Sequence, residues 1–349
     1  MYRLDKGRFD EFIRLLGREY RTYAPVRTAG RTGFAIVDSA GMIDTDVLVT
    51  DMSPKEIFFP PSETLFRYGR NGIKTDEVPE RPIAVWGIRS CDVRSLSMLD
   101  RVFGSAVQMP EDDRFKDPYW NHRYGSSLLF GSACIDPSPT CFCNWFGGGP
   151  FNKDGMDVFT VDAGEYYLLE PVSGKGQEFI GGLACLAPAG ESELDLVSAI
   201  AAEAASRMPE EEDLKEAGRK LSDIFDEPVW SELSAKCVNC GACTFCCPTC
   251  HCFDIQDESR GSEGRRVRIW DSCMFPIFTR EASGHNPRAL SKERVRQRIM
   301  HKYSYSLENY GEFLCTGCGR CVLVCPVNLD IRDVLRRLLH YRAEGKCNG

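Results

Sequence analysis

Two cysteine motifs constrain this chain more than any other feature of its sequence. Residues 237–248 read CVNCGACTFCCP, and residues 315–326 read CTGCGRCVLVCP. Each is a C-x2-C-x2-C-x3-C-P run, the bacterial spacing of cysteine ligands for iron–sulfur clusters. The first three thiolates of such a run bind one cluster, and the fourth binds the other cluster of the pair. The sequence therefore predicts two [4Fe–4S] clusters whose ligand sets are interleaved.

The interleaved spacing assigns each motif cysteine to one of the two clusters. Cluster I is predicted to use Cys237, Cys240, Cys243 and Cys325. Cluster II is predicted to use Cys315, Cys318, Cys321 and Cys247. Structural zinc is the competing interpretation, but a zinc ribbon needs only two separated C-x2-C pairs. A third cysteine and a proline-flanked fourth, both present twice, favour iron–sulfur clusters.

Length, charge and cysteine usage narrow the class of protein further. The chain has 349 residues, 18 cysteines and a formal net charge of −8. This length is enough for two domains, and the acidic balance disfavours nucleic acid as a partner. Residues 1–17 are charged and amphipathic, unlike a signal peptide, and no apolar run approaches the ~20 residues needed to span a bilayer. We therefore expect a cytoplasmic chain without a membrane span, in which cysteines bind metal instead of forming disulfides.

The first part of the chain has the pattern of a mixed α/β domain. Apolar residues on one face predict a helix over 7–19. Short apolar and β-branched runs bounded by turn residues predict strands over 46–50, 81–88, 127–131, 156–161 and 166–170. We expect this domain to occupy residues 1–208.

Two of these predicted strands lead directly to cysteines. The 81–88 run leads to Cys91, and the 127–131 run leads to Cys134, with Cys141 and Cys143 shortly after. Open α/β sheets place their sites beyond the carboxyl ends of strands, so these four thiols are candidates for a third [4Fe–4S] cluster. Buried structural thiols and a four-thiolate zinc site are the alternatives. Cys185, in an apolar run, is expected to belong to the core.

The second part, residues 209–349, is expected to be mostly helical around a two-cluster ferredoxin-like core, which makes the whole chain α+β. Helical stretches on either side of an acidic joint near 209 lead to Cys237. A helical insertion over about 253–312 separates the motifs, and a closing helix is expected over 328–340. Basic residues over 292–302 balance anionic clusters, form a docking surface or belong to a solvated helix face.

Several further features carry less information. Four cysteines in and near the insertion belong to neither ligand set: Cys246, Cys250, Cys252 and Cys273. We expect them to pack around the clusters, and a further metal site is the alternative. The glycines at 147–149 and the Ser-Gly-Lys-Gly at 173–176 match no nucleotide-binding pattern. We therefore expect no flavin or nicotinamide site on this chain.

Several segments are shared with one family of proteins. They are Arg89-Ser-Cys-Asp92, Cys134 with Cys141-Phe-Cys143, Cys247-Pro-Thr-Cys-His-Cys252, Trp270-Asp-Ser-Cys273 and His285-Asn-Pro-Arg288. Together they resemble the beta subunits of sulfhydrogenases, the iron–sulfur subunits of anaerobic sulfite reductases, and related subunits of flavin oxidoreductase–heterodisulfide reductase complexes. The resemblance runs over nearly the whole chain. One departure is Asn144-Trp-Phe-Gly147, where the family usually has a smaller Ser-Met-Gly loop.

Because four cysteines close each predicted C-terminal cluster, we expect no substrate turnover by this chain alone and no catalytic residues. The resemblance implies an electron-transfer subunit of an anaerobic oxidoreductase complex. Its implied partners are an NAD(P)H-binding flavoprotein and a terminal catalytic subunit of hydrogenase, sulfite reductase or heterodisulfide reductase type. One alternative is that the N-terminal cluster is catalytic through an exchangeable ligand. A second alternative, an iron–sulfur redox sensor, is disfavoured because the chain is acidic and lacks a nucleic-acid-binding motif.

Overall fold

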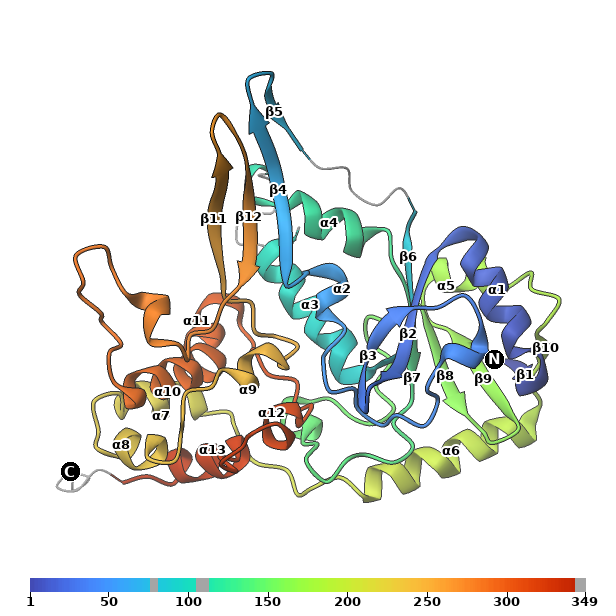
Figure 1. Cartoon of the computed structure of the whole chain (residues 1–349). Helices are drawn as coiled ribbons and strands as arrows, with labels where there is room; N and C mark the ends of the chain where they lie inside the picture. The colour runs from blue at the N-terminus through green and yellow to red at the C-terminus, as the bar shows by residue number, and fades with distance from the viewer. Residues whose placement is uncertain (76–80, 105–112, 343–349) are drawn as a thin grey trace. The chain divides into compact units, whose positions relative to one another are not determined.

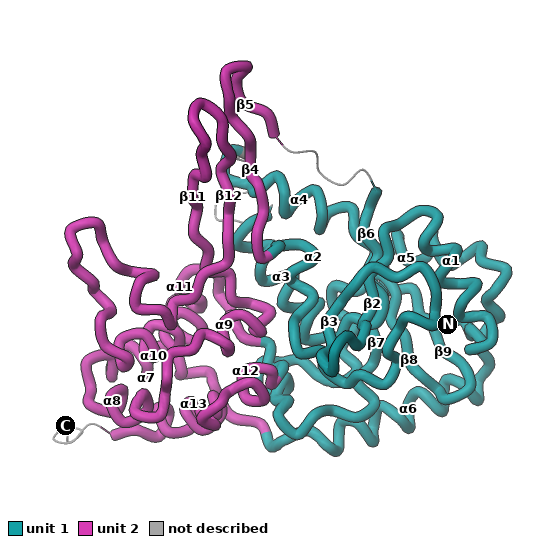
Figure 2. The backbone as a smooth tube through the Cα atoms, viewed as in Figure 1, with its two compact units in different colours: residues 1–60, 77–210, 316–318 teal, residues 61–76, 211–315, 319–349 magenta. Residues whose placement is uncertain are grey.

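The computed structural model describes residues 1–75, 81–104 and 113–342. The chain folds into two compact units, coloured separately in Figure 2. Unit 1 comprises residues 1–60, 77–210 and 316–318. Unit 2 comprises residues 61–76, 211–315 and 319–349. The chain passes from one unit to the other after Glu210, beside the domain boundary expected near 209, but each unit also contains a segment that the sequence assigned to the other.

Unit 1 is built on an eight-stranded mixed sheet with strand order β10-β1-β9-β8-β7-β6-β2-β3. The strands are β1 Tyr2–Asp5, β2 Arg21–Thr28, β3 Arg31–Ile36, β6 Ile83–Arg89, β7 Leu128–Ser132, β8 Val158–Asp162, β9 Tyr166–Pro171 and β10 Ala187–Pro188. Neighbours from β2 through β6 and β7 to β8 are parallel, and the outer pairs are antiparallel. Parallel β6 and β7 therefore end at the same edge of the sheet (Figure 1).

The described residues of unit 1 form several helices. They are α1 Phe9–Glu19, α2 Lys55–Phe58, α3 Ser90–Phe103, α4 Pro118–Gly125, α5 Gly174–Ile180 and α6 Glu191–Ser206. Of these, α1, α3 and α5 contact strands of the sheet. From α1, the fully buried Phe12 ring meets Trp86 of β6 at 5.5 Å and Phe130 of β7 at 5.7 Å between centroids. Such aromatic packing fixes α1 on the sheet because each ring buries a large apolar area. Cys185 is buried in the same core, as expected.

Unit 2 contains short helices around the two cysteine motifs. They are α7 Ala217–Asp223, α8 Val229–Ser234, α9 Ala242–Phe245, α10 Ser291–Met300, α11 Ser306–Tyr310, α12 Arg320–Leu323 and α13 Ile331–Leu339. A π-helical turn, His301–Tyr305, joins α10 to α11. The closing helix α13 buries Ile331, Val334, Leu335 and Leu338, the helical spacing from which it was predicted.

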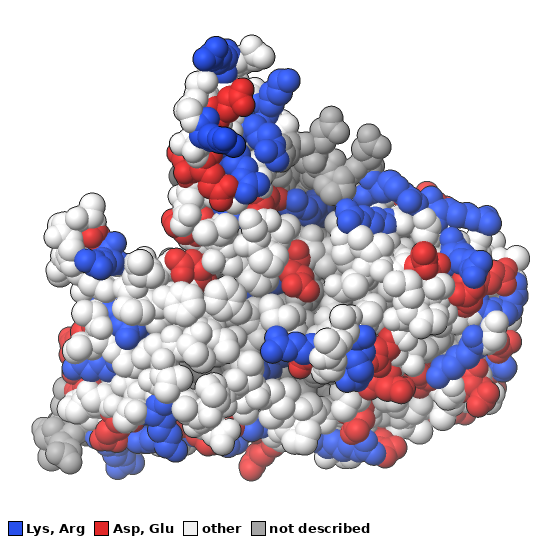
Figure 3. Space-filling model, in the orientation of Figure 1, with Lys and Arg blue, Asp and Glu red and all other residues white. Residues whose placement is uncertain are grey.

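Unit 2 also contains a four-stranded antiparallel sheet that the sequence analysis missed. Its order is β11-β12-β4-β5, from β11 Phe253–Arg260, β12 Glu263–Trp270, β4 Ser62–Gly69 and β5 Gly72–Lys74. The insertion between the motifs is thus a hairpin followed by helix, where helix alone was expected. A buried ion pair joins Arg268 of β12 to Glu63 of β4. Basic and acidic side chains lie together over the exposed hairpins (Figure 3), where Arg265 pairs with Glu258.

Most strands predicted in unit 1 are confirmed within one or two residues, as β6, β7, β8 and β9. The strand predicted over 46–50 is wrong, because that segment forms turns. The Asp44 carboxylate accepts a hydrogen bond of 3.2 Å from the Asp46 N–H, and such side-chain turns compete with strand pairing. Among the described residues, no helix is long and apolar enough to cross a membrane.

Candidate metal centre

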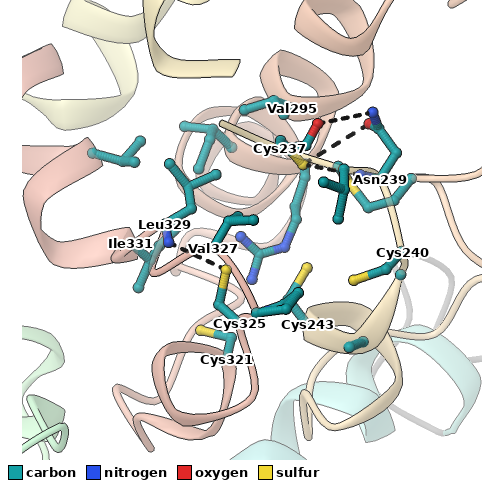
Figure 4. A pocket seen from close by; sticks show the side chains of 18 residues that line it. Cys237, Asn239, Cys240, Cys243, Val295, Cys321, Cys325, Val327, Leu329 and Ile331 are labelled. Atoms are coloured by element: carbon teal, nitrogen blue, oxygen red, sulfur yellow. Dashed lines mark hydrogen bonds between the residues drawn. The ribbon is translucent and has the colours of Figure 1, made fainter. Parts of the chain in front are cut away.

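Five cysteines of unit 2 line one cavity (Figure 4). Four of them, Cys237, Cys240, Cys243 and Cys325, are the predicted ligands of cluster I, and the fifth, Cys321, was predicted for cluster II. The cavity volume is about 50 Å³, several times the roughly 10–15 Å³ that a single water molecule needs. The predicted ligands are thus brought together around a space larger than water requires, and the donor set is the one that iron–sulfur clusters use.

Local backbone geometry places these cysteines. Gly241 adopts φ 75° at the start of α9, which carries Cys243, and a Cβ there would lie 2.8 Å from the Phe275 ring. Only glycine fits such a position without strain. The turn therefore brings Cys240 and Cys243 to the same side of the loop, as Figure 4 shows.

Backbone N–H groups donate to two of these sulfurs. The Asn239 N–H donates to Cys237 Sγ at 3.4 Å, and the Leu329 N–H donates to Cys325 Sγ at 3.2 Å. Burial raises the pKa of the Cys237 thiol, while the Asn239 hydrogen bond lowers it. Hydrogen bonds to ligand sulfurs favour the thiolate and help to set the potential of a cluster.

A second group of thiols surrounds the buried Lys302 in unit 2. Its ammonium donates to Cys247 Sγ at 3.2 Å, to Thr249 Oγ1 at 2.8 Å and to the Leu314 carbonyl at 2.9 Å. Burial lowers the pKa of Lys302, but the thiols of Cys247, Cys250 and Cys315 outweigh it and raise the pKa above the ordinary value. The ammonium is therefore held in its charged form.

Cys321 completes this second group. Burial raises its pKa to about 12; the nearby Arg298 guanidinium acts against this rise, and Cys247 and Cys315 add to it. Three predicted cluster II ligands, Cys247, Cys315 and Cys321, therefore lie in one electrostatic neighbourhood of unit 2.

Cys318, the fourth predicted ligand of cluster II, lies in unit 1 beside the N-terminal thiols. Its carbonyl oxygen is 4.0 Å from Cys141 Sγ, within hydrogen-bond range for a sulfur donor. The Phe142 N–H donates to the Gly317 carbonyl at 2.8 Å. Burial, with added repulsion from the thiols of Cys134, Cys143 and Cys318, raises the pKa of Cys141 to about 12.

The loop that carries these N-terminal thiols is firmly held. A 3-10 turn spans Cys143–Phe146 and ends at Gly147, which has φ 69°. Within unit 1, the Asn144 amide donates to the Pro209 carbonyl at 2.7 Å, and the Trp145 indole N–H donates to the Glu210 carbonyl at 2.8 Å. The bulky Asn-Trp-Phe residues thus tie the cysteine loop to the end of unit 1.

The remaining candidate cysteines lie near these groups. Cys134 follows β7, and its N–H donates to the Pro150 carbonyl at 3.0 Å. Cys91 lies on the first turn of α3, directly after β6, and its part in a third cluster stays a prediction. Of the cysteines that no motif uses, Cys252 and Cys273 are hydrogen-bonded to each other, which raises the pKa of Cys273.

The spacing of these thiols differs from that of a single-ion site. In the described part of the chain, no three His, Cys, Asp or Glu side chains converge closely enough to hold one metal ion. Tetrahedral zinc at a Zn–S distance of ~2.3 Å requires sulfurs only ~3.8 Å apart. A polynuclear cluster holds its thiolates at its corners, further apart than a single ion does.

Comparison with known proteins agrees with this geometry. Residues 236–329 match the family model described as a 4Fe-4S dicluster domain. The chain is 31% identical over 339 residues to sulfhydrogenase 2 subunit beta of Pyrococcus furiosus, covering 94% of this chain and 95% of the relative. The chain belongs to the sulfhydrogenase beta subunit family. It is accordingly an iron–sulfur electron-transfer subunit with a ferredoxin-like 4Fe-4S domain in its C-terminal region. No solved structure matches it.

Two charged residues of this family member were not singled out from sequence. Arg298 and Lys302 lie within the basic stretch, for which a solvated face was an equal interpretation. Lys302 is only 4% exposed, and Arg298 lines the cavity of Figure 4 with its Nε buried and without a hydrogen-bond partner among the described residues. Their spacing of four residues puts both on one helix face, but no sequence signal distinguishes that face from a solvated one.

Proposed function

We propose that this chain relays electrons within a cytoplasmic multi-subunit oxidoreductase. Its electron-exchanging partners would be an NAD(P)H-linked flavoprotein and a terminal catalytic subunit of hydrogenase, sulfite reductase or heterodisulfide reductase type. The name of the relative, a beta subunit of a sulfhydrogenase, supports a setting of several subunits. The chain itself would not turn over a substrate.

The observation that carries this proposal is the cavity lined by Cys237, Cys240, Cys243 and Cys325. Four thiolates would close every iron corner of a [4Fe–4S] cluster bound there, so no position would remain for substrate. When bound, such a cluster supplies one-electron transfer. The chain's own contribution is to hold the thiolates and to donate backbone hydrogen bonds to sulfur.

The proposal includes a second cluster and an N-terminal one. Cluster II would be held by Cys315, Cys318, Cys321 and Cys247, following the motif. The N-terminal cluster would be held by Cys91, Cys134, Cys141 and Cys143. The contact between Cys141 Sγ and the Cys318 carbonyl supports a relay, because it connects a ligand of one proposed site to a ligand of the other through one weak hydrogen bond.

Anaerobic purification of the tagged full-length chain from its native host tests this function. We expect a flavoprotein to copurify, and NAD(P)H to produce the EPR signals of reduced [4Fe–4S] clusters in that complex. A Cys240→Ala variant should lose the signal of one cluster, whereas Cys185→Ala, which removes a core thiol outside the proposed sites, should keep every signal. Clusters that dithionite reduces and NAD(P)H does not would contradict the proposed electron donor.

A further inference from the structure

Lys302 is a buried cation that donates one of its three hydrogen bonds to a thiol of the second group. Its three donors go to Cys247 Sγ, Thr249 Oγ1 and the Leu314 carbonyl. An ammonium has three N–H donors, so this set leaves none for water. The side chain is therefore fixed in one position by its surroundings.

No carboxylate in the described part of the chain forms an ion pair with Lys302. Burying an ammonium without a counter-charge is costly, because water solvates it strongly. The Cys247 sulfur, 3.2 Å from Nζ, is the one partner that can carry a full negative charge. The folded chain thus places a fixed positive charge against one ligand thiolate.

The backbone that carries Lys302 is unusual as well. The residue lies in the π-helical turn His301–Tyr305 that interrupts the helix between α10 and α11. Such turns are rare and are frequent at functional sites. The extra residue in the turn rotates the side chains that follow α10. The Leu314 N–H also donates to the Lys302 carbonyl at 3.0 Å, which fixes the turn from its other side.

Arg298 provides the internal comparison. It lines the cavity of the first cysteine set, and the thiols of Cys243, Cys321 and Cys247 all act on its charge. Its positive charge is therefore shared between the two thiol groups. The hydrogen bond of Lys302, in contrast, goes to Cys247 alone among the cysteines.

We propose that Lys302 is a positioning residue that raises the reduction potential of the cluster bound through Cys247 above that of the cluster bound through Cys237. This inference rests on the proposed function, since it requires Cys247 to be a cluster ligand. Adding an electron makes a cluster one unit more negative, so a fixed cation and a hydrogen bond to its ligand sulfur stabilise the reduced form more than the oxidised form. Electrons would then collect at the second cluster before leaving the subunit.

Redox titration followed by EPR on the anaerobically purified full-length chain tests this inference. In Lys302→Met, we expect the ratio of reduced to oxidised second cluster at a fixed potential to fall at least threefold. This change corresponds to about 28 mV for a one-electron couple, at 59 mV per tenfold change. The first cluster should shift less. Lys302→Arg should restore most of the wild-type potential, because it keeps the charge and the donors.

Lys292→Met is the matched control, because it removes the same charge from the first turn of α10 at a partly exposed position. If Lys302→Met fails to fold, Lys302→Gln takes its place in the titration, because it keeps a hydrogen-bond donor and removes the charge. Iron and sulfide contents are measured on every variant. A chain without clusters in the wild type would defeat the proposed function itself.

Intact clusters with unchanged potentials in Lys302→Met would overturn only the role of Lys302. An equal shift of both clusters would overturn the selectivity. Loss of the second cluster in all three Lys302 variants would show that the lysine is needed to hold the cluster, which also overturns a role in setting its potential.

Discussion

Replacing Gly317 by alanine tests how closely the second cysteine motif packs on the N-terminal thiol loop within unit 1. Gly317 has φ 64°, and a Cβ on it would lie 2.6 Å from the Cys143 Cα and even closer to the Phe142 carbonyl oxygen. Both atoms belong to the backbone, so neither can rotate away as a side chain would. The two segments must move apart, which breaks the 2.8 Å hydrogen bond from the Phe142 N–H to the Gly317 carbonyl.

The expected cost follows from these two effects. The left-handed conformation costs an alanine about 1–2 kcal/mol, and loss of a backbone hydrogen bond costs about 0.5–1.5 kcal/mol. The free energy of unfolding should therefore fall by about 2–3 kcal/mol. Gly311→Ala is the matched control, because Gly311 has φ 71° and no atom within 4 Å of the added Cβ. That control should lose only the conformational part.

Urea unfolding, together with hydrogen–deuterium exchange of the 134–150 segment, measures both effects. Gly317→Ala should be less stable than Gly311→Ala and should expose the amides of the cysteine loop to faster exchange. Equal destabilisation of the two variants, with exchange over 134–150 unchanged from wild type, would refute the close packing of Gly317 on this loop.

Two further predictions concern unit 2. Arg268→Met breaks the ion pair between Arg268 and Glu63, whose side chains are 5% and 4% exposed, and leaves the Glu63 carboxylate buried without its cation. The free energy of unfolding, measured by thermal unfolding, should therefore fall by about 3–5 kcal/mol. The double variant Arg268→Met/Glu63→Met should recover much of this loss, and no recovery would mean that the ion pair is not its cause. Burial, with added repulsion from nearby cations, lowers the pKa of His301 to about 4. Between pH 6.5 and 4 the unfolded chain binds a proton at this histidine and the folded chain does not. The free energy of unfolding of wild type should therefore fall by up to about 3 kcal/mol as the pH is lowered from about 6.5 to 4, and His301→Gln should remove this part of the pH dependence. A His301→Gln variant with the same pH dependence as wild type would contradict the prediction.

The cluster ligands of the two cysteine motifs could be predicted from the sequence because the motif is defined by spacing along a short stretch of chain. Cys237, Cys240 and Cys243 lie within one loop, and a glycine between them permits the turn. Their gathering around one cavity with Cys325 needed only the motif rule. The strands of unit 1 were equally local, since each is a short apolar run between turn residues.

Features that depend on contacts between distant segments of the chain could not be predicted from the sequence. Strand β4 at Ser62–Gly69 pairs with β12 at Glu263–Trp270, and nothing within either segment indicates the other. In the sequence, nothing distinguishes Lys302 from the other basic residues of its helix; its burial and its hydrogen bond to Cys247 are seen only in the structure. The packing of Gly317 on Phe142 likewise joins residues far apart in the chain, so the neighbours of Cys318 could not be foreseen.

Iron and acid-labile sulfide content of anaerobically purified protein tests the central claim most directly. Wild type is measured beside Cys141→Ala/Cys143→Ala and beside Cys237→Ala/Cys240→Ala, with Cys185→Ala as the control. We expect about twelve irons per chain in wild type and in the control, and about eight in each double variant, for three [4Fe–4S] clusters. About eight irons in wild type and no loss in Cys141→Ala/Cys143→Ala would contradict the N-terminal cluster. A wild-type chain without labile sulfide would contradict the electron relay as a whole.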